Sequence, residues 1–368
     1  MTFPLKVLYE EFGQSPWLDN LKRSYITSGE LATVRDTGIR GLTSNPTIFQ
    51  KAIQGSSDYS SQFAELIGQK LSPVDSYWQL VLRDINGALD VFAPLHESSN
   101  GLDGFVSVEV DPGLAHDHAN TLTSARDLHS KISRPNVMIK IPATRECIPA
   151  IATMISEARN VNVTLIFSLE RYQQVMDAYI DGLETLAIDR PAIVGSVSSV
   201  ASFFISRVDT EIDRLLAGKD NAMANALLGT AAINQAKLAY AMFRKTFSGP
   251  RWNRLEKLGA KVQRPLWAST STKNPNYPDT LYVDNLIGQD TVNTLPDSTV
   301  EAFCDHGTLK STIQTDVDLA HQQWSELARV GVDVSDVAER LEREGVASFQ
   351  KSFDELIGVL SEKAVELS

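Results

Sequence analysis

Cysteine and histidine are scarce in this sequence of 368 residues, which has two cysteines, Cys147 and Cys304, and six histidines. Two cysteines are too few for a disulfide framework, so we expect reduced thiols. His116 and His118 are two positions apart, which on a helix points them to different sides, and no third ligand stands at a metal-site spacing. We therefore expect neither a disulfide-stabilised protein nor a metal enzyme.

Long apolar runs, glycine-rich phosphate loops and the Gly-x-Ser-x-Gly elbow of many hydrolases are also missing. No run approaches the roughly 20 apolar residues of a membrane span, and the first residues lack a charged leader before an apolar core. The net charge of −12 argues against a general nucleic-acid or anionic-membrane surface. We expect a cytoplasmic protein without nucleic-acid or membrane partners, in which local cations bind any anionic ligand.

Short β-rich runs alternate with helical patterns from the start of the chain to about residue 295, which is typical of a parallel sheet. Eight such units in one chain favour a closed (β/α)8 TIM barrel over an open sheet. The predicted strands are 15–21, 39–45, 104–111, 136–143, 161–168, 199–206, 264–270 and 290–295. The predicted helical segments between them are 60–71, 74–92, 115–132, 147–158, 169–182, 209–247 and 282–287.

The last part of the chain, residues 297–368, has no strand-like run and has helical spacing with many charges. We expect these helices to pack on the outside of the barrel and to add a cover at its end. Because we find no repeat, linker or low-complexity segment, we interpret residues 1–368 as one (β/α)8 domain with a helical C-terminal extension.

The run NVMIKIPAT, residues 136–144, has a lysine in the middle of a strand that should be fully buried. A buried ammonium costs several kcal/mol, roughly, unless it finds a partner or loses its charge. Neighbouring strands also have one polar face, formed by Ser107, Glu109 and Asp111 on one strand and beginning with Asn162 and Thr164 on another. Inward-facing residues near the carboxyl ends of barrel strands line the active site. We therefore expect the residues that fall late in their predicted strands to converge on one pocket, namely Lys140, Glu109, Asn162, Thr164, Asn45 and Asp19.

Each of these residues also has a purely structural explanation. Lys140 can be the ion-pair partner of Glu109, and intramolecular pairs also perturb charges. Asn45 precedes a proline and Asp19 precedes a helix, so either can be a helix cap. The hydroxyl of Ser202 can make local hydrogen bonds only. A site explains best why so many polar groups coincide at strand ends.

A lysine amine in an apolar strand is neutral more often than in water and can attack a carbonyl group to form a Schiff base. This chemistry needs an acid to dehydrate the carbinolamine and a base for the hydroxyl beside the bond that breaks. Glu109 and Asp19 are the available carboxylates, and Thr164 can hold a water between Glu109 and the imine. The residues therefore indicate carbon–carbon bond chemistry.

Six runs in order, GLTSNPTIF, VSVEVDP, MIKIPAT, NVNVTLIFS, SFFISRVD and RPLWASTSTKN, resemble those of transaldolases of the longer bacterial subfamily. The resemblance spans about residues 15–296. It implies a (β/α)8 class I aldolase-type enzyme without a cofactor. Such an enzyme works in the non-oxidative pentose phosphate pathway. Its small-molecule sugar phosphate substrates are sedoheptulose 7-phosphate, the donor of a dihydroxyacetone unit, and glyceraldehyde 3-phosphate, the acceptor.

The resemblance also implies roles for individual residues. Lys140 is the Schiff-base lysine, Glu109 the acid/base that acts through water, Thr164 the residue that places this water, and Asp19 the base for aldol cleavage. Residues that bind the sugar or its phosphate are Asn45, Thr43, Ser107, Asn162, Ser202, Arg207, Ser269 and Lys273. Of these, Arg207 and Ser269 hold the phosphate, whereas Lys273 stands near the place where the shorter transaldolases have an arginine.

Two other functions stay open on the sequence alone. One is a related Schiff-base aldolase that releases free dihydroxyacetone, and the other is a catalytically silent barrel that binds sugar phosphates as a sensor. The sequence equally leaves open whether the protein is a monomer or a homodimer.

Overall fold

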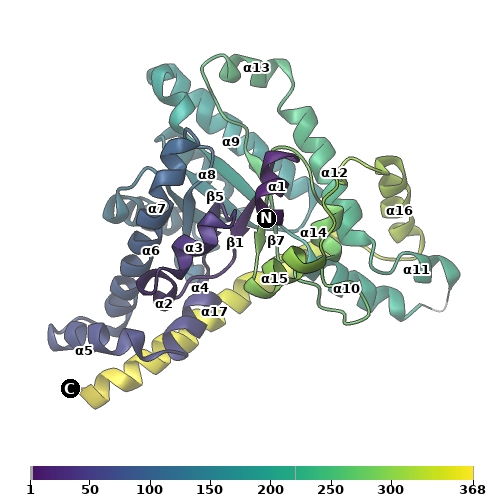
Figure 1. Ribbon diagram of the computed structural model, residues 1–368. Coiled ribbons are helices and arrows are strands. Elements are labelled where there is room, and N and C mark those ends of the chain that lie inside the picture. Colours follow the sequence, from purple (N-terminus) through teal and green to yellow (C-terminus); the bar gives the residue numbers. More distant parts are fainter. Residues whose placement is uncertain (1–2, 220, 368) are drawn as a thin grey trace.

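Eight parallel strands form a closed barrel in the computed structural model, which describes residues 3–219 and 221–367 (Figure 1). The strands are β1 Gln14–Leu18, β2 Gly41–Thr43, β3 Phe105–Glu109, β4 Val137–Pro142, β5 Val161–Ile166, β6 Ser199–Phe204, β7 Arg264–Ala268 and β8 Thr291–Leu295. Each strand pairs with the next along the chain, and β8 pairs with β1. The predicted (β/α)8 fold is confirmed, and each predicted strand overlaps one of these, although β1 begins one residue before the predicted 15–21.

The strands are buried on both faces because helices cover them on the outside and side chains fill the barrel on the inside. Apart from the half-buried Arg264, every strand residue is buried. β1 and β2 end earlier than predicted, at Leu18 and Thr43, so Asp19 and Asn45 lie just beyond them. Both side chains therefore start at the carboxyl end of the barrel.

The helices surround this barrel and extend beyond it at the C-terminus. They are α1 Pro4–Glu10, α2 Arg23–Thr27, α3 Glu30–Asp36, α4 Pro46–Gln54, α5 Ser60–Gly68, α6 Pro73–Ser98, α7 His118–Ile132, α8 Ile148–Ser156, α9 Leu169–Asp189, α10 Ser206–Ala217, α11 Ala222–Ala226, α12 Ala231–Thr246, α13 Pro250–Glu256, α14 Leu281–Asn285, α15 Asp297–His306, α16 Val317–Arg329 and α17 Val334–Leu367. Short 3-10 turns are η1 Ser57–Tyr59, η2 Pro112–Leu114 and η3 Pro191–Ser196. None of the helices within residues 3–219 and 221–367 combines the length and apolarity that crossing a membrane requires.

The prediction of one helical segment over 209–247 is wrong, because the structure divides it into α10, α11 and α12. Gly218 ends α10, and the side chain of Asn221 caps α11 by accepting a hydrogen bond from Ala224 N. Gly229 has a φ of +70°, and a Cβ there would lie 2.9 Å from the ring of Tyr277. A left-handed residue packed this tightly favours glycine and ends a helix.

Helix α17 is the long yellow helix in Figure 1, which runs beside α4 toward the C-terminus. Arg340 near its beginning forms an ion pair with Glu211 of α10, at 2.5 Å between Nη1 and Oε1. Further along, Ser352 Oγ lies 2.8 Å from Thr47 Oγ1 of α4, and Phe353 packs edge-on against Tyr77 of α6. The helix therefore joins elements from distant parts of the barrel.

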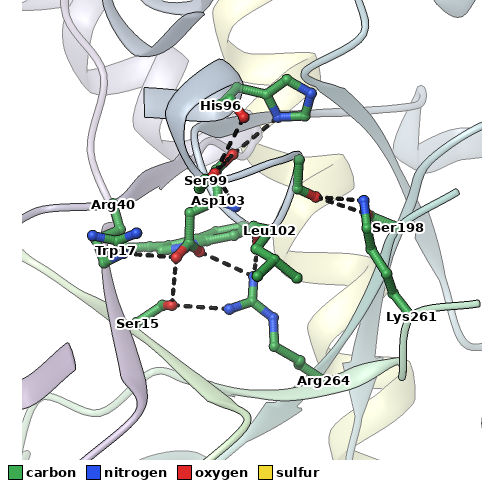
Figure 2. Close-up of polar contacts among 11 residues, drawn as sticks. Ser15, Trp17, Arg40, His96, Ser99, Leu102, Asp103, Ser198, Lys261 and Arg264 are labelled. Carbon is green, nitrogen blue, oxygen red and sulfur yellow. Dashed lines mark hydrogen bonds and ion pairs between the residues drawn. The ribbon is translucent and has the colours of Figure 1, made fainter. Parts of the chain in front are cut away.

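A buried carboxylate, Asp103, organises the opposite, amino-terminal end of the strands (Figure 2). Its two oxygens accept hydrogen bonds from Ser15 Oγ, Trp17 Nε1, Arg40 Nε and Arg264 Nη2, at 2.7 to 3.3 Å. The donors come from β1, from the residue before β2 and from β7, so a single side chain links these parts of the sheet. Polar groups at this end of a TIM barrel serve stability rather than catalysis.

Candidate active site

A cavity of about 140 Å³ lies at the carboxyl ends of the strands. Its lining includes most of the predicted site residues: Asp19, Thr43, Asn45, Lys140, Thr164, Ser202, Arg207, Ser269 and Lys273. Larger cavities of about 250 and 430 Å³ lie elsewhere and are lined by none of the predicted residues. The other predicted residues, Glu109, Ser107 and Asn162, are buried beside the 140 Å³ cavity and contact its lining or one another.

Strand register brings Lys140 together with two predicted partners. Glu109 of β3 and Asn162 of β5 are the register neighbours of Lys140 on β4. In-register residues of adjacent strands point to the same face of a sheet, so the three side chains share the barrel interior. Lys140 Nζ lies 3.2 Å from Glu109 Oε2 and also donates a hydrogen bond to Ser44 O at 3.2 Å. The ion pair that the sequence allowed is therefore present inside the site.

Burial controls the protonation of both predicted catalytic carboxylates. It raises the pKa of the Glu109 carboxyl above its usual value, and the nearby positive charge of Lys140 lowers that pKa in part. It also raises the pKa of the Asp19 carboxyl, against the effects of Lys140 and of a hydrogen bond from Thr43. Carboxyl groups with raised pKa values can hold and return a proton near neutral pH, as an acid/base must.

Asp19 does not cap a helix, since the following helix α2 has no side-chain cap. Its Oδ1 instead accepts a hydrogen bond from Thr43 Oγ1 at 2.7 Å, and this hydroxyl lies 2.6 Å from Thr294 Oγ1 of β8. The carboxylate is thereby fixed at the rim of the cavity by residues from two strands. The structural alternative for Asp19 is wrong, although its role in catalysis stays a prediction.

Asn45 combines the two interpretations that the sequence allowed. Its Oδ1 caps helix α4 by accepting a hydrogen bond from Ile48 N at 2.9 Å, as an Asn before a proline-started helix is expected to do. The same side chain lines the cavity. The cap fixes the orientation of the amide, and its Nδ2 can then serve as a donor for a ligand hydroxyl.

Three predicted polar residues form a hydrogen-bonded chain across the barrel. Ser202 Oγ donates to Asn162 Oδ1 at 2.7 Å, and Asn162 Nδ2 donates to Ser107 Oγ at 3.0 Å. Only Ser202 lines the cavity, whereas Asn162 and Ser107 are fully buried behind it. Ser107 therefore holds Asn162 in place, and its contact with substrate stays a prediction.

Thr164 lies at an irregular point of β5. The register of β5 and β6 shifts between Val163 and Ile166, and Leu165 has a φ of +60°, which is rare for a branched residue. The Thr164 hydroxyl lines the cavity and is buried, and no group in the described part of the chain hydrogen-bonds to it. Backbone strain of this kind occurs where a side chain must be aimed at a site.

Two cations, Arg207 and Lys273, also line the cavity. Burial lowers the pKa of the Arg207 guanidinium, and no carboxylate among the described residues forms an ion pair with it. Lys273 Nζ donates a hydrogen bond to Ser271 Oγ at 2.6 Å, and burial together with the charges of Arg207 and Lys51 lowers its pKa. A dianionic group here would relieve the repulsion between Lys273 and Arg207.

Ser269 directly follows β7 and lines the same cavity. It has a φ of +57°, and its Oγ is 2.9 Å from Ser206 Oγ at the start of α10. Its backbone also accepts a hydrogen bond from Ser206 N, so it ties the loop after β7 to α10, which carries Arg207. Ser269 thus lines the cavity and also holds the two cation-bearing segments together.

Sequence reasoning missed several lining residues, namely Phe204, Ala268, Ser271, Thr294, Pro296 and Phe349. Thr294 is late in a predicted strand, so the rule that selected Thr164 could have found it. Phe349 comes from α17, and no local pattern in the sequence marks it. Within residues 3–219 and 221–367, no group of three or more His, Cys, Asp or Glu side chains is placed to hold a metal ion.

Comparison with known proteins agrees with this geometry. Residues 16–360 match the family model described as Transaldolase/Fructose-6-phosphate aldolase. A transaldolase of Parafrankia sp. is 48% identical over 354 residues, which cover 95% of both chains. The transaldolase of Frankia alni is 45% identical over 99% of this chain and 98% of its own, and that of Acidothermus cellulolyticus is 46% identical over 98% and 97%.

Proposed function

Because the chain belongs to the transaldolase/fructose-6-phosphate aldolase family, we propose that it is a transaldolase acting through a Schiff base on Lys140. It takes a dihydroxyacetone unit from sedoheptulose 7-phosphate and transfers it to glyceraldehyde 3-phosphate, in the non-oxidative pentose phosphate pathway. The products are erythrose 4-phosphate and fructose 6-phosphate. The observation that carries the proposal is the buried Lys140–Glu109 pair in the cavity wall, at 3.2 Å.

The first steps use this pair. When Lys140 passes its proton to Glu109, its neutral amine attacks the ketose carbonyl and forms a carbinolamine. Loss of water then gives the protonated imine, and Glu109 is the acid that supplies the proton for the leaving hydroxyl. The unpartnered Thr164 hydroxyl and Glu109 Oε2 are both buried, so a water bound between them would carry this proton.

Carbon–carbon cleavage uses Asp19. The carboxylate takes the proton from the hydroxyl next to the bond, the bond breaks, and its electrons move into the imine to form an enamine on Lys140. Thr43 and Thr294 hold Asp19 for this step. Asn45, Ser202 and the buried Asn162 support the sugar hydroxyls, while Arg207, Ser269 and Lys273 bind the phosphate. The acceptor aldehyde then reverses these steps.

Reductive trapping tests the proposal. Borohydride added with fructose 6-phosphate should join a dihydroxyacetone unit to the peptide that contains Lys140, as measured by mass spectrometry. Lys140→Met should abolish trapping. Lys237 provides a matched control, because it is also a buried lysine but donates to Thr315 O outside the cavity, so Lys237→Met should still be trapped.

The same incubations distinguish the alternatives. A transaldolase should form sedoheptulose 7-phosphate when erythrose 4-phosphate is added, whereas an aldolase should release free dihydroxyacetone with or without this acceptor. A silent binding protein should give no trapped adduct at all. The expected cytoplasmic location, the sugar phosphate partners and the choice between monomer and homodimer remain predictions.

A further inference from the structure

An aromatic ring from the C-terminal helix α17 closes the cavity over the reacting lysine. Phe349 lines the cavity and is itself only 4% exposed. Its ring centroid lies 5.8 Å from Lys140 Nζ and 6.0 Å from Arg207 Cζ. One side chain therefore reaches both the predicted covalent centre and the predicted phosphate ligand, and it comes from outside the barrel.

Contacts on both sides hold Phe349 in this position. Four residues earlier, a Cβ at Gly345 would lie 3.0 Å from Leu165 Cδ2 and 3.6 Å from Arg207 Nη1, so the helix passes directly over β5 and α10. Three residues later, Ser352 Oγ lies 2.8 Å from Thr47 Oγ1 of α4. The segment between these contacts spans the mouth of the barrel, and Phe349 points into the cavity from it.

We propose that Phe349 shields the enamine on Lys140 from protonation by bulk water and so favours transfer of the dihydroxyacetone unit over its release. This inference rests on the proposed transaldolase function. The ring faces of aromatic residues also attract cations within about 6 Å, so the same side chain favours the positively charged imine. A water that acts with Glu109 and Thr164 lies on the strand side of the cavity. Phe349 covers the cavity from the opposite side, where α17 lies.

Two reactions compete for the enamine on Lys140. In transfer, the enamine carbon attacks the aldehyde carbon of the acceptor, a carbon–carbon bond forms, and the aldehyde oxygen takes up a proton. Water then adds to the imine carbon of the product, the bond to Lys140 Nζ breaks, and sedoheptulose 7-phosphate leaves. In hydrolysis, the enamine carbon takes up a proton to give the imine, water adds to the imine carbon, and the bond to Lys140 Nζ breaks. Both routes consume one water in this last step and return the lysine amine, but only the second protonates the enamine carbon and returns free dihydroxyacetone. Exclusion of bulk water from the enamine carbon slows this protonation, which transfer does not need.

The test measures both routes in one enzyme. With fructose 6-phosphate alone, glyceraldehyde 3-phosphate and dihydroxyacetone report hydrolysis, and with erythrose 4-phosphate present, sedoheptulose 7-phosphate reports transfer. Phe349→Ala should raise the ratio of hydrolysis to transfer by roughly tenfold or more, because it opens the helix side of the cavity to water. Phe349→Leu keeps an apolar side chain there and should restore most of the wild-type ratio.

Leu356 is the matched control, since it is a buried residue of the same helix that does not line the cavity. Leu356→Ala loosens the packing of α17 and should leave the ratio unchanged. An unchanged ratio in Phe349→Ala would overturn the inference and leave the proposed function intact. If Phe349→Ala and Phe349→Leu lose both reactions equally, the ring is needed for folding only, and this result would also overturn the inference. A wild-type enzyme that releases dihydroxyacetone and transfers none would overturn the proposed function together with the shield.

Discussion

Glu109 and Lys140 are register partners on adjacent strands, and their charged atoms lie 3.2 Å apart where each side chain is only 5% exposed. This relationship explains how a lysine is tolerated in the middle of a buried strand. A buried charge is costly alone, but a close partner of opposite charge offsets much of that cost. The same contact gives the amine a nearby group to which it can pass its proton before it attacks a carbonyl.

Glu109→Gln should lower kcat by about 10²–10⁴-fold, the range for loss of a general acid/base, because the amide cannot exchange a proton with the carbinolamine. Steady-state kinetics with fructose 6-phosphate and erythrose 4-phosphate measures this. Thr164→Ala should lose less, since other groups can still hold a water. Asp111→Asn is the control, because Asp111 lies beyond the strand and caps η2. A wild-type kcat in Glu109→Gln would mean that Glu109 is not the acid/base and has only a structural role.

Arg207→Ala should raise KM for fructose 6-phosphate by roughly tenfold or more, as loss of a charged hydrogen bond of ~1.5–3 kcal/mol implies. The phosphate is remote from the reacting carbonyl, so its binding is similar in the ground and transition states, and kcat should fall less than KM rises. Lys273→Ala should also raise KM, but less. The lysine ammonium is a point charge, whereas the arginine guanidinium can donate two parallel hydrogen bonds to a phosphate.

Two comparisons make this phosphate test specific. Arg214→Ala removes an exposed arginine of the same helix that pairs with Glu211, and it should leave KM unchanged. Turnover of unphosphorylated fructose should be affected much less by Arg207→Ala than turnover of the phosphorylated sugar. If both Arg207→Ala and Lys273→Ala keep the wild-type KM, these side chains do not bind the phosphate.

The central part of the site was predictable because parallel strands impose a simple rule. Side chains alternate between two faces, and late residues on the inner face meet at one end of a barrel, so Lys140, Glu109 and Thr164 could be grouped from their strands alone. Asp19 and Asn45 were harder, since a polar residue just after a strand can be a cap or a ligand. Only the structure excludes a helix cap at Asp19, because its carboxylate accepts a hydrogen bond from Thr43 and α2 has no side-chain cap.

The contribution of α17 could not be predicted for a different reason. Its sequence indicates an amphipathic helix, but the place where such a helix docks depends on the shape of the barrel surface. Phe349 reaches Lys140 because Gly345 allows close approach to Leu165 and because Ser352 meets Thr47. The single helix predicted over 209–247 is wrong for a similar reason. The packing of Tyr277 against Gly229 is a contact between residues distant in the sequence, and no local pattern reveals it.

Asp103→Ala should lower the free energy of unfolding by roughly 3–5 kcal/mol, because it removes a fully buried carboxylate and leaves two half-buried arginines, Arg40 and Arg264, without their shared partner. Chemical denaturation measures this loss. The cluster lies at the amino-terminal end of the strands, so kcat per folded molecule should stay near the wild-type value at low temperature (Figure 2). Asp90→Asn breaks the exposed ion pair with Arg134 and should cost less than about 1 kcal/mol. Equal costs for both variants would contradict this prediction.

The stability of the protein should also depend on Asp209, a buried carboxyl group of α10. Its Oδ1 accepts a hydrogen bond from Ala232 N at 2.6 Å, at the start of α12, and its Oδ2 accepts one from Tyr282 Oη at 3.0 Å. Burial, with a smaller effect from the charge of Asp213, raises its pKa from 3.8 to about 7. In the unfolded chain the group ionises near its ordinary value, so the folded state binds more protons between these two pH values.

Stability from Asp209 is therefore complete below about pH 4 and is lost as the pH rises through about 7. Asp209→Asn cannot ionise, but its Oδ1 can still accept the hydrogen bond from Ala232 N and its Nδ2 can donate one to Tyr282 Oη. The free energy of unfolding of the wild type, minus that of Asp209→Asn, should fall by at most about 4 kcal/mol across this range. Denaturant titrations at a series of pH values measure the difference. Asp213→Asn removes the neighbouring charge that raises the pKa of Asp209, so it should move the midpoint of this fall to lower pH. A difference between wild type and Asp209→Asn that is constant from pH 4 to 8 would mean that Asp209 ionises alike in the folded and unfolded chains.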